Sequence, residues 1–194
     1  MVERTLSSDI DILIERLQET DYSELQSFSC GTEELDNFFR EELPLCVKYR
    51  YFAAYCAKER YSGELVAVFT LANDIVVVGS VEDKADFVED VKFLMDDEYV
   101  QTFERQSSFP AINIGHLGIR EDWQSKGIGS QIVDFILYTF SNYRLSGCQF
   151  ITVDSLNNPR TNKFYMNNGF VNQTNNDSVS HTRRMYMYLP VSGN

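Results

Sequence analysis

The chain has 194 residues, of which 43% are hydrophobic, so it can bury one sizeable core. No linker rich in proline, glycine or serine divides it, and we expect a single domain over residues 1–194. Residues 1–17 mix charged with apolar side chains and contain no continuous apolar run. This composition argues against a signal peptide and a membrane span, and it favours a cytoplasmic protein.

The formal net charge of -12 is distributed unevenly along the chain. Residues 1–100 carry 23 acidic and 9 basic side chains, whereas residues 101–194 carry 6 acidic and 8 basic ones. The nearly neutral half can hold an anionic ligand without repelling it. The acidic half either favours a cationic substrate or only keeps the protein soluble.

The first 46 residues predict a short strand and then helices. Residues 10–17 read as a strand that runs into a helix. Thr32 is a candidate helix N-cap, followed by two glutamates in the first turn. The predicted helix then carries an apolar stripe at helical spacing, made by Leu35, Phe38, Phe39, Leu43 and Cys46.

The next segment predicts a hairpin and then an acidic insert. Residues 51–57 and 65–72 read as strands joined by the turn-prone residues 61–64, and residues 75–78 are a further short apolar run. Residues 81–107 contain nine acidic and three basic side chains. Their apolar residues recur at helical spacing, which indicates a helical insert that flanks a substrate opening or forms a solvated peripheral helix: Phe87, Val91, Leu94 and Met95.

Between residues 111 and 140 the pattern changes from strand to loop to helix. Residues 111–119 are apolar and contain two glycines, as in a buried strand that another group approaches closely. Residues 123–130 read W-Q-S-K-G-I-G-S. The helical spacing that follows is made by Ile132, Val133, Ile136, Leu137 and Phe140.

The loop of residues 124–130 has the chemistry of a polyphosphate cradle. Gly127 and Gly129 let the backbone curl with its N–H groups inward, and the following helix presents its positive N-terminal end. Short polar side chains at 124, 125 and 130 add donors. The spacing matches neither G-x-x-x-x-G-K-[ST] nor G-x-G-x-x-G with an acidic residue about twenty positions later. ATPases and dinucleotide-binding proteins are therefore disfavoured.

The last part of the chain predicts a strand, a capped helix and a final strand. Residues 148–153 read as a strand. Asn158 is a candidate N-cap with Pro159 at the first helical position, and Gly169 closes this helix. Residues 183–189 alternate in polarity and give the final strand. The mixed order predicts an α/β fold with a central sheet.

Two motifs resemble those of the GNAT acyltransferase superfamily. The loop reads Q-x-x-G-x-G from Gln124, similar to the family's [QR]-x-x-G-x-[GA]. A second motif starts at Asn158 and resembles N-x-x-A-x-x-F-Y-x-x-x-G-F, with Thr161 in the small-residue position. This resemblance covers residues 110–190. It implies a mixed, mostly antiparallel sheet that is splayed between its fourth and fifth strands, with helices on both faces.

The resemblance implies acetyl-CoA as co-substrate and no metal. In that family the loop holds the coenzyme A diphosphate, and unpaired backbone groups near the end of the fourth strand hold the pantetheine arm and polarise the thioester. Matched residue by residue, the implied coenzyme-binding positions are Leu117, Gly118, Ile119, Gln124, Ser125, Lys126, Gly127, Ile128, Gly129, Ser130, Asn158 and Phe164.

Acetyl transfer requires an unprotonated amine, a stabilised oxyanion and a thiolate that leaves with a proton. Tyr165 matches the family's tyrosine that protonates the coenzyme sulfur. A phenol pKa near 10 and a thiol pKa near 8.5 make this transfer uphill by roughly 2 kcal/mol, which a positioned hydrogen bond can offset. Many members carry a glutamate base on the fourth strand, but residues 111–119 contain none. His116, Asp154 and a chain of waters are the alternatives.

The four cysteines are widely spaced and form no C-x-x-C pair. Only His116 and His181 could complete a metal site, so disulfides and zinc are both disfavoured. We expect ordinary buried thiols, with a cysteine acyl carrier as the alternative. The residues concerned are Cys30, Cys46, Cys56 and Cys148.

A looser resemblance extends to the first half of the chain. It is carried by F-x-C-G-x-x-x-L-D-x-F from Phe28, F-T-L from Phe69 and P-A-x-x-I-G-x-L from Pro110. These patterns are similar to a GNAT branch that includes toxins that acetylate aminoacyl-tRNA and are neutralised by a small DNA-binding antitoxin. His116 departs from the arginine common in that branch, and the acidic excess disfavours a polyanion. Only a local cluster could bind tRNA: Arg105, Arg160, Lys163, Arg183 and Arg184.

Three hypotheses follow from these patterns. The first is an acetyl-CoA-dependent N-acetyltransferase in which a primary amine attacks the thioester directly. The second is a tRNA-acetylating toxin with an antitoxin-like partner, and the third is a non-catalytic acyl-CoA-binding module. The acceptor is not encoded in the motifs, because variable loops form acceptor grooves. A homodimer remains open, and no membrane partner is expected.

Overall fold

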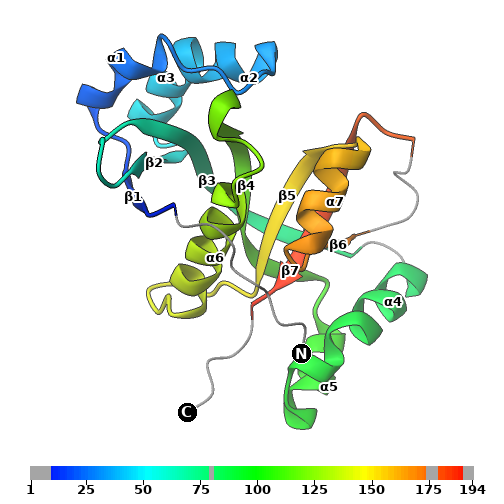
Figure 1. The fold of residues 1–194 in the computed structure, drawn as a ribbon. Helices are drawn as coiled ribbons and strands as arrows, with labels where there is room; N and C mark the ends of the chain where they lie inside the picture. The colour runs from blue at the N-terminus through cyan, green and yellow to red at the C-terminus, as the bar shows by residue number, and fades with distance from the viewer. Residues whose placement is uncertain (1–9, 79–80, 174–178, 190–194) are drawn as a thin grey trace. The chain divides into compact units, whose positions relative to one another are not determined.

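The computed structural model describes residues 10–78, 81–173 and 179–189, and it shows a mixed sheet with helices around it (Figure 1). The sheet has seven strands in the order β1-β2-β3-β4-β5-β7-β6. The neighbours β1–β2, β2–β3, β5–β7 and β6–β7 are antiparallel, and β4–β5 are parallel. The predicted α/β class with a mostly antiparallel sheet is confirmed.

The chain forms two compact units. The first contains Met1–Ala72 and Gly115–Phe135, and the second contains Asn73–Ile114 and Ile136–Asn194. Three elements contribute to both units, namely β3 (Leu65–Val77), β4 (Ser108–Ile119) and α6 (Ile128–Ser141). The single domain expected over residues 1–194 stays a prediction.

The strands of the first unit form an antiparallel meander. β1 (Ile12–Arg16) pairs with β2 (Ala53–Glu59), and β2 pairs with β3. The predicted hairpin is confirmed. The apolar run at residues 75–78 is not a separate strand, because β3 continues without interruption to Val77.

The helices from the N-terminal part of the first unit cover one face of these strands (Figure 1). After β1 come η1 (Glu19–Asp21) and α1 (Tyr22–Leu25), as the strand-to-helix prediction required. The helix predicted after Thr32 consists of α2 (Glu33–Asn37), a π-helical turn η2 (Phe38–Glu42) and α3 (Leu43–Lys48). Thr32 occupies the N-cap position, but its side chain makes no capping hydrogen bond.

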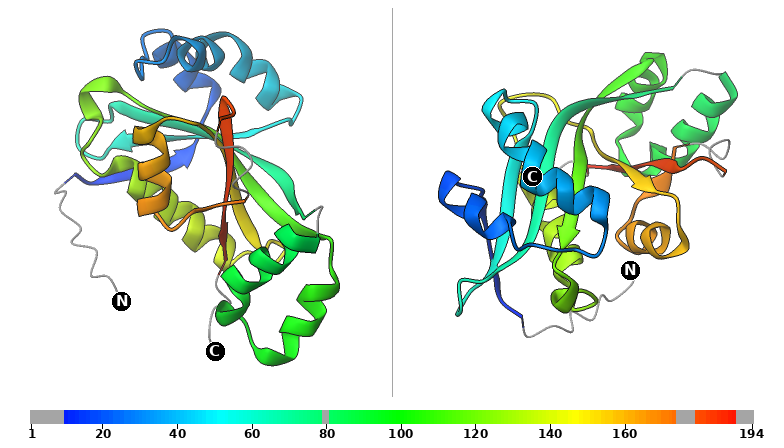
Figure 2. Two further views of the ribbon diagram at one scale, coloured as in Figure 1. Left: turned by 90° about the vertical axis from the view of Figure 1, so that its right-hand side faces the viewer. Right: turned by 90° about the horizontal axis from the view of Figure 1, so that it is seen from above.

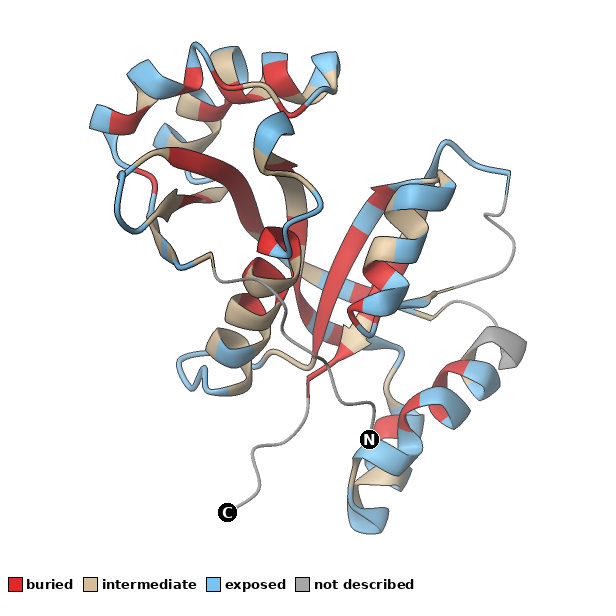
Figure 3. Cartoon of the chain, viewed as in Figure 1, coloured by how far each residue is buried: buried red, intermediate tan, exposed pale blue. Residues whose placement is uncertain are grey.

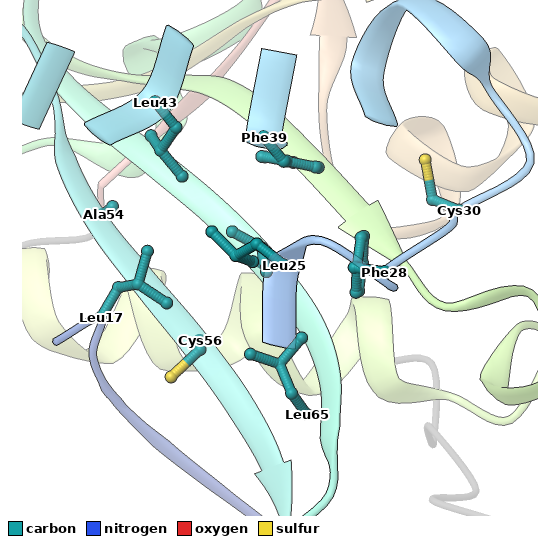
Figure 4. Packing of buried hydrophobic residues seen from close by; sticks show 10 residues of the cluster. Leu17, Leu25, Phe28, Cys30, Phe39, Leu43, Ala54, Cys56 and Leu65 are labelled. Carbon is teal, nitrogen blue, oxygen red and sulfur yellow. The ribbon is translucent and has the colours of Figure 1, made fainter. Parts of the chain in front are cut away.

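The core of the first unit lies between these helices and the sheet (Figure 4). On β2, alternate residues face opposite sides. Ala54 and Cys56 join this core, while the ring of Tyr55 faces Phe135 of α6 at 6.4 Å. Each large side chain buried here contributes about 1.5–3 kcal/mol of transfer free energy. The buried members are Leu17, Leu25, Phe28, Cys30, Phe39, Leu43, Ala54, Cys56, Leu65 and Val68.

The acidic insert belongs to the second unit and forms α4 (Val81–Val91), η3 (Lys92–Leu94) and α5 (Asp97–Arg105). The two longer helices pack against each other, as Figure 2 shows from two directions. Figure 3 shows buried and exposed positions alternating around α4. Phe87 and Val91 are buried, as predicted, but Leu94 is 44% exposed because η3 ends the periodic helix before it.

An aromatic core joins this insert to the strands of the second unit. β5 (Phe150–Leu156) lies between β4 and β7 (Thr182–Tyr188), with β6 (Val171–Asn172) at the edge. β5 begins and ends later than predicted, and the two-residue β6 was not predicted. The buried core is made by Val76, Phe87, Val88, Val91, Phe103, Phe109, Ala111, Phe150, Tyr186 and Tyr188.

The only parallel pairing in the described sheet joins the fourth and fifth strands. Its pairs run from Ala111–Phe150 to Ile114–Val153. Each strand continues beyond these pairs, to Ile119 on β4 and to Leu156 on β5. The splay expected between the two strands beyond this point stays a prediction.

None of the helices in the described ranges has the length and apolar character needed to cross a bilayer. The N-terminal prediction also rested on residues 1–9, which lie outside the described residues. The cytoplasmic location stays a prediction.

Candidate functional site

The loop between β4 and α6 has an unusual backbone conformation. A short helix η4 (Glu121–Trp123) follows β4, and α6 starts at Ile128. Between them, Ser125 and Gly127 adopt φ angles of 61° and 82°. Glycine enters this left-handed region freely, whereas a serine there is strained by about 1–3 kcal/mol. Such strain persists only where the surroundings fix the backbone.

The loop leaves its backbone amides free for a ligand. The first hydrogen bond of α6 runs from the Gln131 amide to the Gly127 carbonyl at 3.1 Å, so the preceding amides have no helical acceptor. Within the described part of the chain, no backbone acceptor is found for the N–H groups of residues 125–130. A helix N-terminus with unused amides fits a diphosphate. The residues present therefore fit the coenzyme group that the motif implies.

Side chains contribute less to this loop than its backbone does. The Lys126 ammonium lies 4.7 Å from the centroid of the Trp123 ring, and Lys126 is exposed. Ile128 is buried and begins α6. Binding of coenzyme by Ser125, Lys126, Gly127, Ile128, Gly129 and Ser130 stays a prediction.

Gln124 has a structural role that the sequence did not indicate. Its side-chain amide donates to the carbonyl of Cys30 at 2.7 Å and to that of Ile119 at 3.0 Å. These two bonds use both hydrogens of the amide. The side chain that we expected to donate to the coenzyme thus anchors the loop instead, and a direct contact with the coenzyme stays a prediction.

The end of β4 is tightly packed by aromatic rings. A Cβ atom at Gly118 would lie 2.5 Å from the Phe39 ring, and one at Gly115 would lie 2.8 Å from the Phe52 ring. Any larger residue at these positions would force the strand and the rings apart. The close approach expected at these glycines is present, and it comes from the protein's own side chains. Backbone binding of pantetheine by Leu117, Gly118 and Ile119 stays a prediction.

His116 is part of the same aromatic packing. Its ring stacks on Phe38 at a centroid distance of 3.6 Å, and its Nδ1 lies 3.0 Å from the Thr70 hydroxyl. Burial lowers the pKa of His116 to about 4. A neutral imidazole with so low a pKa is a poor proton acceptor, so this geometry disfavours His116 as the general base.

The proposed acid lies on α7 (Pro159–Asn167), in the second unit. Asn158 caps this helix, because its side-chain oxygen accepts from the Thr161 amide at 2.9 Å. Gly169 has a φ angle of 90° and follows the helix, as predicted. The local signals placed the helix correctly. Whether Asn158 also contacts the coenzyme stays a prediction.

Tyr165 is enclosed by apolar neighbours. It is 5% exposed, and its ring lies 4.9 Å from that of Phe164 and 5.2 Å from that of Phe170. Burial alone raises the pKa of its hydroxyl above the ordinary value of 10, and no hydrogen bond to a described residue opposes this effect. The phenol therefore keeps its proton at neutral pH. The catalytic role of Tyr165 and the coenzyme contact of Phe164 stay predictions.

Asp154, the second candidate base, belongs to an ion-pair network. The Arg184 guanidinium donates to Asp154 at 2.6 Å and also to Asp74, whose carboxylate accepts from the Thr152 hydroxyl. One oxygen of the Asp154 carboxylate is therefore occupied by the ion pair with Arg184. The same contacts engage Arg184, which belongs to the basic cluster that the sequence analysis considered for binding tRNA.

The cysteines show no sign of a nucleophile. Burial raises the pKa of Cys30 and Cys148 to about 11 and that of Cys56 to about 12. Thiolates are therefore scarce at these three positions, which disfavours them as acyl carriers. All four cysteines are free thiols. No group of three or more metal-binding side chains is found within residues 10–78, 81–173 and 179–189.

A family model described as the acetyltransferase (GNAT) domain matches residues 67–172. The match spans more than half of the chain and includes both the loop and α7. The chain therefore belongs to the GNAT acetyltransferases, a family that uses acetyl-CoA as acyl donor. No curated protein sequence matches the chain.

Several solved structures of toxins share this fold. One, described as a bacterial toxin, has a TM-score of 0.70 and 19% identity, covering 93% of this chain and 92% of that chain. A tyrosine-to-phenylalanine variant of the toxin AtaT, bound to the C-terminus of the antitoxin AtaR and acetyl-CoA, has a TM-score of 0.67 and 19% identity, with 92% and 94% covered. AtaT complexed with acetyl-methionyl-tRNAfMet has a TM-score of 0.68 and 21% identity, covering 93% of this chain and 95% of that chain. These identities show a common fold.

Proposed function

We propose that this acetyltransferase transfers the acetyl group of acetyl-CoA to a primary amine, which attacks the thioester directly. The observation that carries the proposal is the loop of residues 124–130. It combines two positive φ angles, unused amides and the start of a helix, in a chain that belongs to the GNAT family. When bound, acetyl-CoA supplies the activated acyl group.

In this proposal, residues of the first unit bind and orient acetyl-CoA. The amides of residues 125–130 hold the diphosphate, and the backbone of Leu117, Gly118 and Ile119 holds the pantetheine arm. Because backbone donors are fixed before the ligand arrives, they stabilise its negative charge without reorganising. The Phe39 ring packs directly against the backbone at Gly118, where a Cβ atom would lie 2.5 Å from it.

Tyr165 is the proton donor in this proposal. Its raised pKa means that the hydroxyl is protonated over the whole neutral range, as a general acid must be. It also makes proton transfer to sulfur more uphill than for an exposed phenol. A direct hydrogen bond from the hydroxyl to the leaving sulfur has to offset that difference.

Water takes up the proton of the acceptor amine in this account. His116 is disfavoured by its low pKa, and Asp154 is paired with Arg184. With no side chain as base, the amine must reach the site already deprotonated or lose its proton through a chain of waters. The rate should then follow the deprotonated fraction of the acceptor.

A turnover screen tests the proposed function. Release of free coenzyme A thiol is measured with acetyl-CoA and polyamines, amino acids, peptides or charged tRNA as acceptors. Turnover with a primary amine supports the proposal. Binding of coenzyme A without thiol release in any mixture would contradict it and favour a non-catalytic acyl-CoA-binding module.

A toxin that acetylates aminoacyl-tRNA is the second candidate. The toxin structures are similar to this chain over more than nine-tenths of its length, which is more than the family match spans. In this second candidate function, the protein would have an antitoxin-like partner. The basic cluster expected to bind tRNA gives it little support, because Arg184 is engaged by Asp74 and Asp154, and Arg160 and Arg183 also have partners.

Growth and acetylation assays separate the two candidates. A toxin arrests growth when the chain is expressed without a partner, and it acetylates the amino group of a charged tRNA. Normal growth together with acetylation of small amines favours the first candidate.

Size-exclusion chromatography with light scattering decides whether the protein is a homodimer.

A further inference from the structure

A hydrogen-bond network connects the proposed coenzyme loop to a segment that lies far from it in sequence. Gln124 donates to the carbonyl of Cys30 at 2.7 Å. The Glu121 amide donates to the carbonyl of Ser29 at 3.1 Å, and the Ser29 hydroxyl lies 3.0 Å from the Glu121 carboxylate. The elements on both sides of the network belong to the first unit. The segment of residues 29–31 therefore braces the loop through these hydrogen bonds.

Asp36 holds that segment in place. Its carboxylate accepts from the Cys30 amide and from the Ser29 hydroxyl, both at 2.7 Å, and the residue is 5% exposed. Burial by itself would raise the pKa of Asp36, but these hydrogen bonds outweigh it and lower the pKa. A charged carboxylate is thus held by hydrogen bonds from Ser29 and Cys30.

Gly31 lets the segment fit against the loop. Its φ angle is 79°, and a Cβ atom there would lie 3.3 Å from the Glu121 side chain. The positive φ angle favours glycine here, and a larger residue would also crowd the Glu121 side chain.

We propose that Asp36 is a positioning residue for the coenzyme: through residues 29–31 and Gln124 it keeps the amides of the loop aimed at the diphosphate. This inference rests on the proposed function. Asp36 itself is not a ligand, because its oxygens are bonded to Cys30 and Ser29 and its negative charge would repel a diphosphate.

The strained backbone of the loop explains why such a brace is needed. Ser125 has a positive φ angle and directly follows the anchored Gln124. A strained residue relaxes unless its neighbours over-determine its conformation. If Gln124 lost its acceptors, the amides would sample many directions, and binding would have to order them again. The cost would appear in coenzyme affinity.

Asp21 provides a matched control. It is also a buried aspartate of the first unit, 4% exposed, and it accepts a backbone amide at 2.7 Å, from Gln18. Its carboxylate also accepts from the Lys58 ammonium at 2.8 Å, and no contact among the described residues connects it to the loop. Asp21→Asn therefore reports the general cost of neutralising a buried carboxylate in this unit.

The experiment measures the dissociation constant for coenzyme A by calorimetry in the full chain and its variants. Asp36→Asn and Gln124→Met should each weaken binding about 10-fold, and Ser29→Ala about 3-fold, because each removes part of the brace. Asp21→Asn should stay within about 2-fold. The double variant Asp36→Asn/Gln124→Met should bind coenzyme A no more weakly than whichever single variant has the lower affinity. Both substitutions act through the same hydrogen-bond network, so their effects should not add.

Kinetics with two acyl donors separates positioning from a general loss of structure. For Asp36→Asn, KM for acetyl-CoA should rise while kcat changes by less than about 3-fold, since the reacting groups are untouched. KM for S-acetylpantetheine, which lacks the diphosphate, should stay unchanged. A variant that merely weakened the fold would lose activity with both donors.

Several outcomes would overturn the inference. These are unchanged coenzyme A affinity in Asp36→Asn and Gln124→Met, equal weakening in Asp21→Asn, or equal losses with both acyl donors. If Asp36→Asn does not fold, Gln124→Met and Ser29→Ala decide, because they leave the buried carboxylate in place. A wild-type protein that binds no coenzyme A would overturn the proposed function as well. Normal wild-type binding with unaffected variants overturns the inference alone.

Discussion

The loop of residues 124–130 and helix α7 differ in what each leaves available for a ligand. In the loop, the backbone amides of residues 125–130 have no backbone acceptor among the described residues, while the Gln124 side chain anchors the loop. In α7, the backbone is satisfied and capped by Asn158, while the hydroxyl of one buried side chain, Tyr165, has no described partner. Under the proposed function, coenzyme binding therefore depends on the backbone conformation of the loop, whereas proton donation depends on the single hydroxyl of Tyr165.

This difference has direct consequences for mutagenesis. A region that binds through its backbone should tolerate changes of side chain unless the change alters φ angles or anchors. A region that acts through one hydroxyl should fail when that single atom is removed.

The largest effect is expected for Tyr165→Phe. Removing a general acid lowers kcat by roughly 100-fold or more, since that is the usual contribution of positioned proton transfer. Coenzyme A affinity should stay within about 2-fold, because the ring and its packing remain. Steady-state kinetics and calorimetry measure both quantities. The control is Tyr138→Phe on the exposed side of α6; unchanged turnover in Tyr165→Phe would remove the assigned acid.

Gly127→Ala should give the next largest effect. A residue with a Cβ pays about 1–2 kcal/mol in the left-handed region, which corresponds to about 5- to 30-fold weaker coenzyme A binding if the loop relaxes. Gly63→Ala is the matched control, because Gly63 also has a positive φ angle, 72°, with no atom within 4 Å of its Cβ position. Calorimetry that found equal affinities for both variants would contradict backbone binding by the loop.

A pH effect on stability is expected from His116. Its pKa in the folded protein, about 4, is below the ordinary value of 6.5, so the unfolded chain binds the extra proton between these pH values. Stability should therefore fall as the pH is lowered from 6.5 to 4, and the fall should be shallower in His116→Phe. Urea unfolding at several pH values measures the two slopes. Parallel curves would show that His116 is not buried as described.

The smallest effect is expected for Lys126→Ala. Its ammonium is exposed, so salt screens it and its interaction with a diphosphate is weak. Coenzyme A affinity should fall by about 3-fold or less, and by less still at high salt. A loss larger than that of Gly127→Ala would mean that the loop binds through its side chains.

The sequence predicted features that depend on neighbours along the chain. Helix α7 could be predicted because Asn158, Pro159 and Gly169 are local signals for its start and its end. The loop before α6 was found in the same way, from Gly127 and its spacing. The hairpin was equally accessible, since a turn separates two apolar runs.

Contacts between distant residues were not accessible in this way. The bond from Gln124 to Cys30 spans 94 residues, and the stack of His116 on Phe38 also joins separate elements. No pattern along the chain specifies such pairs. The motif from Phe28 to Phe38 contains Asp36, but its spacing alone does not show that the Asp36 carboxylate accepts from the Cys30 amide.

In the proposed function, the amides of residues 125–130 hold the diphosphate of coenzyme A. A crystal structure of the protein with coenzyme A tests it most directly. We expect diphosphate oxygens about 2.7–3.2 Å from these amide nitrogens, with Gln124 still bonded to the Cys30 carbonyl. A diphosphate bound elsewhere, or one held only by side chains, would contradict the account.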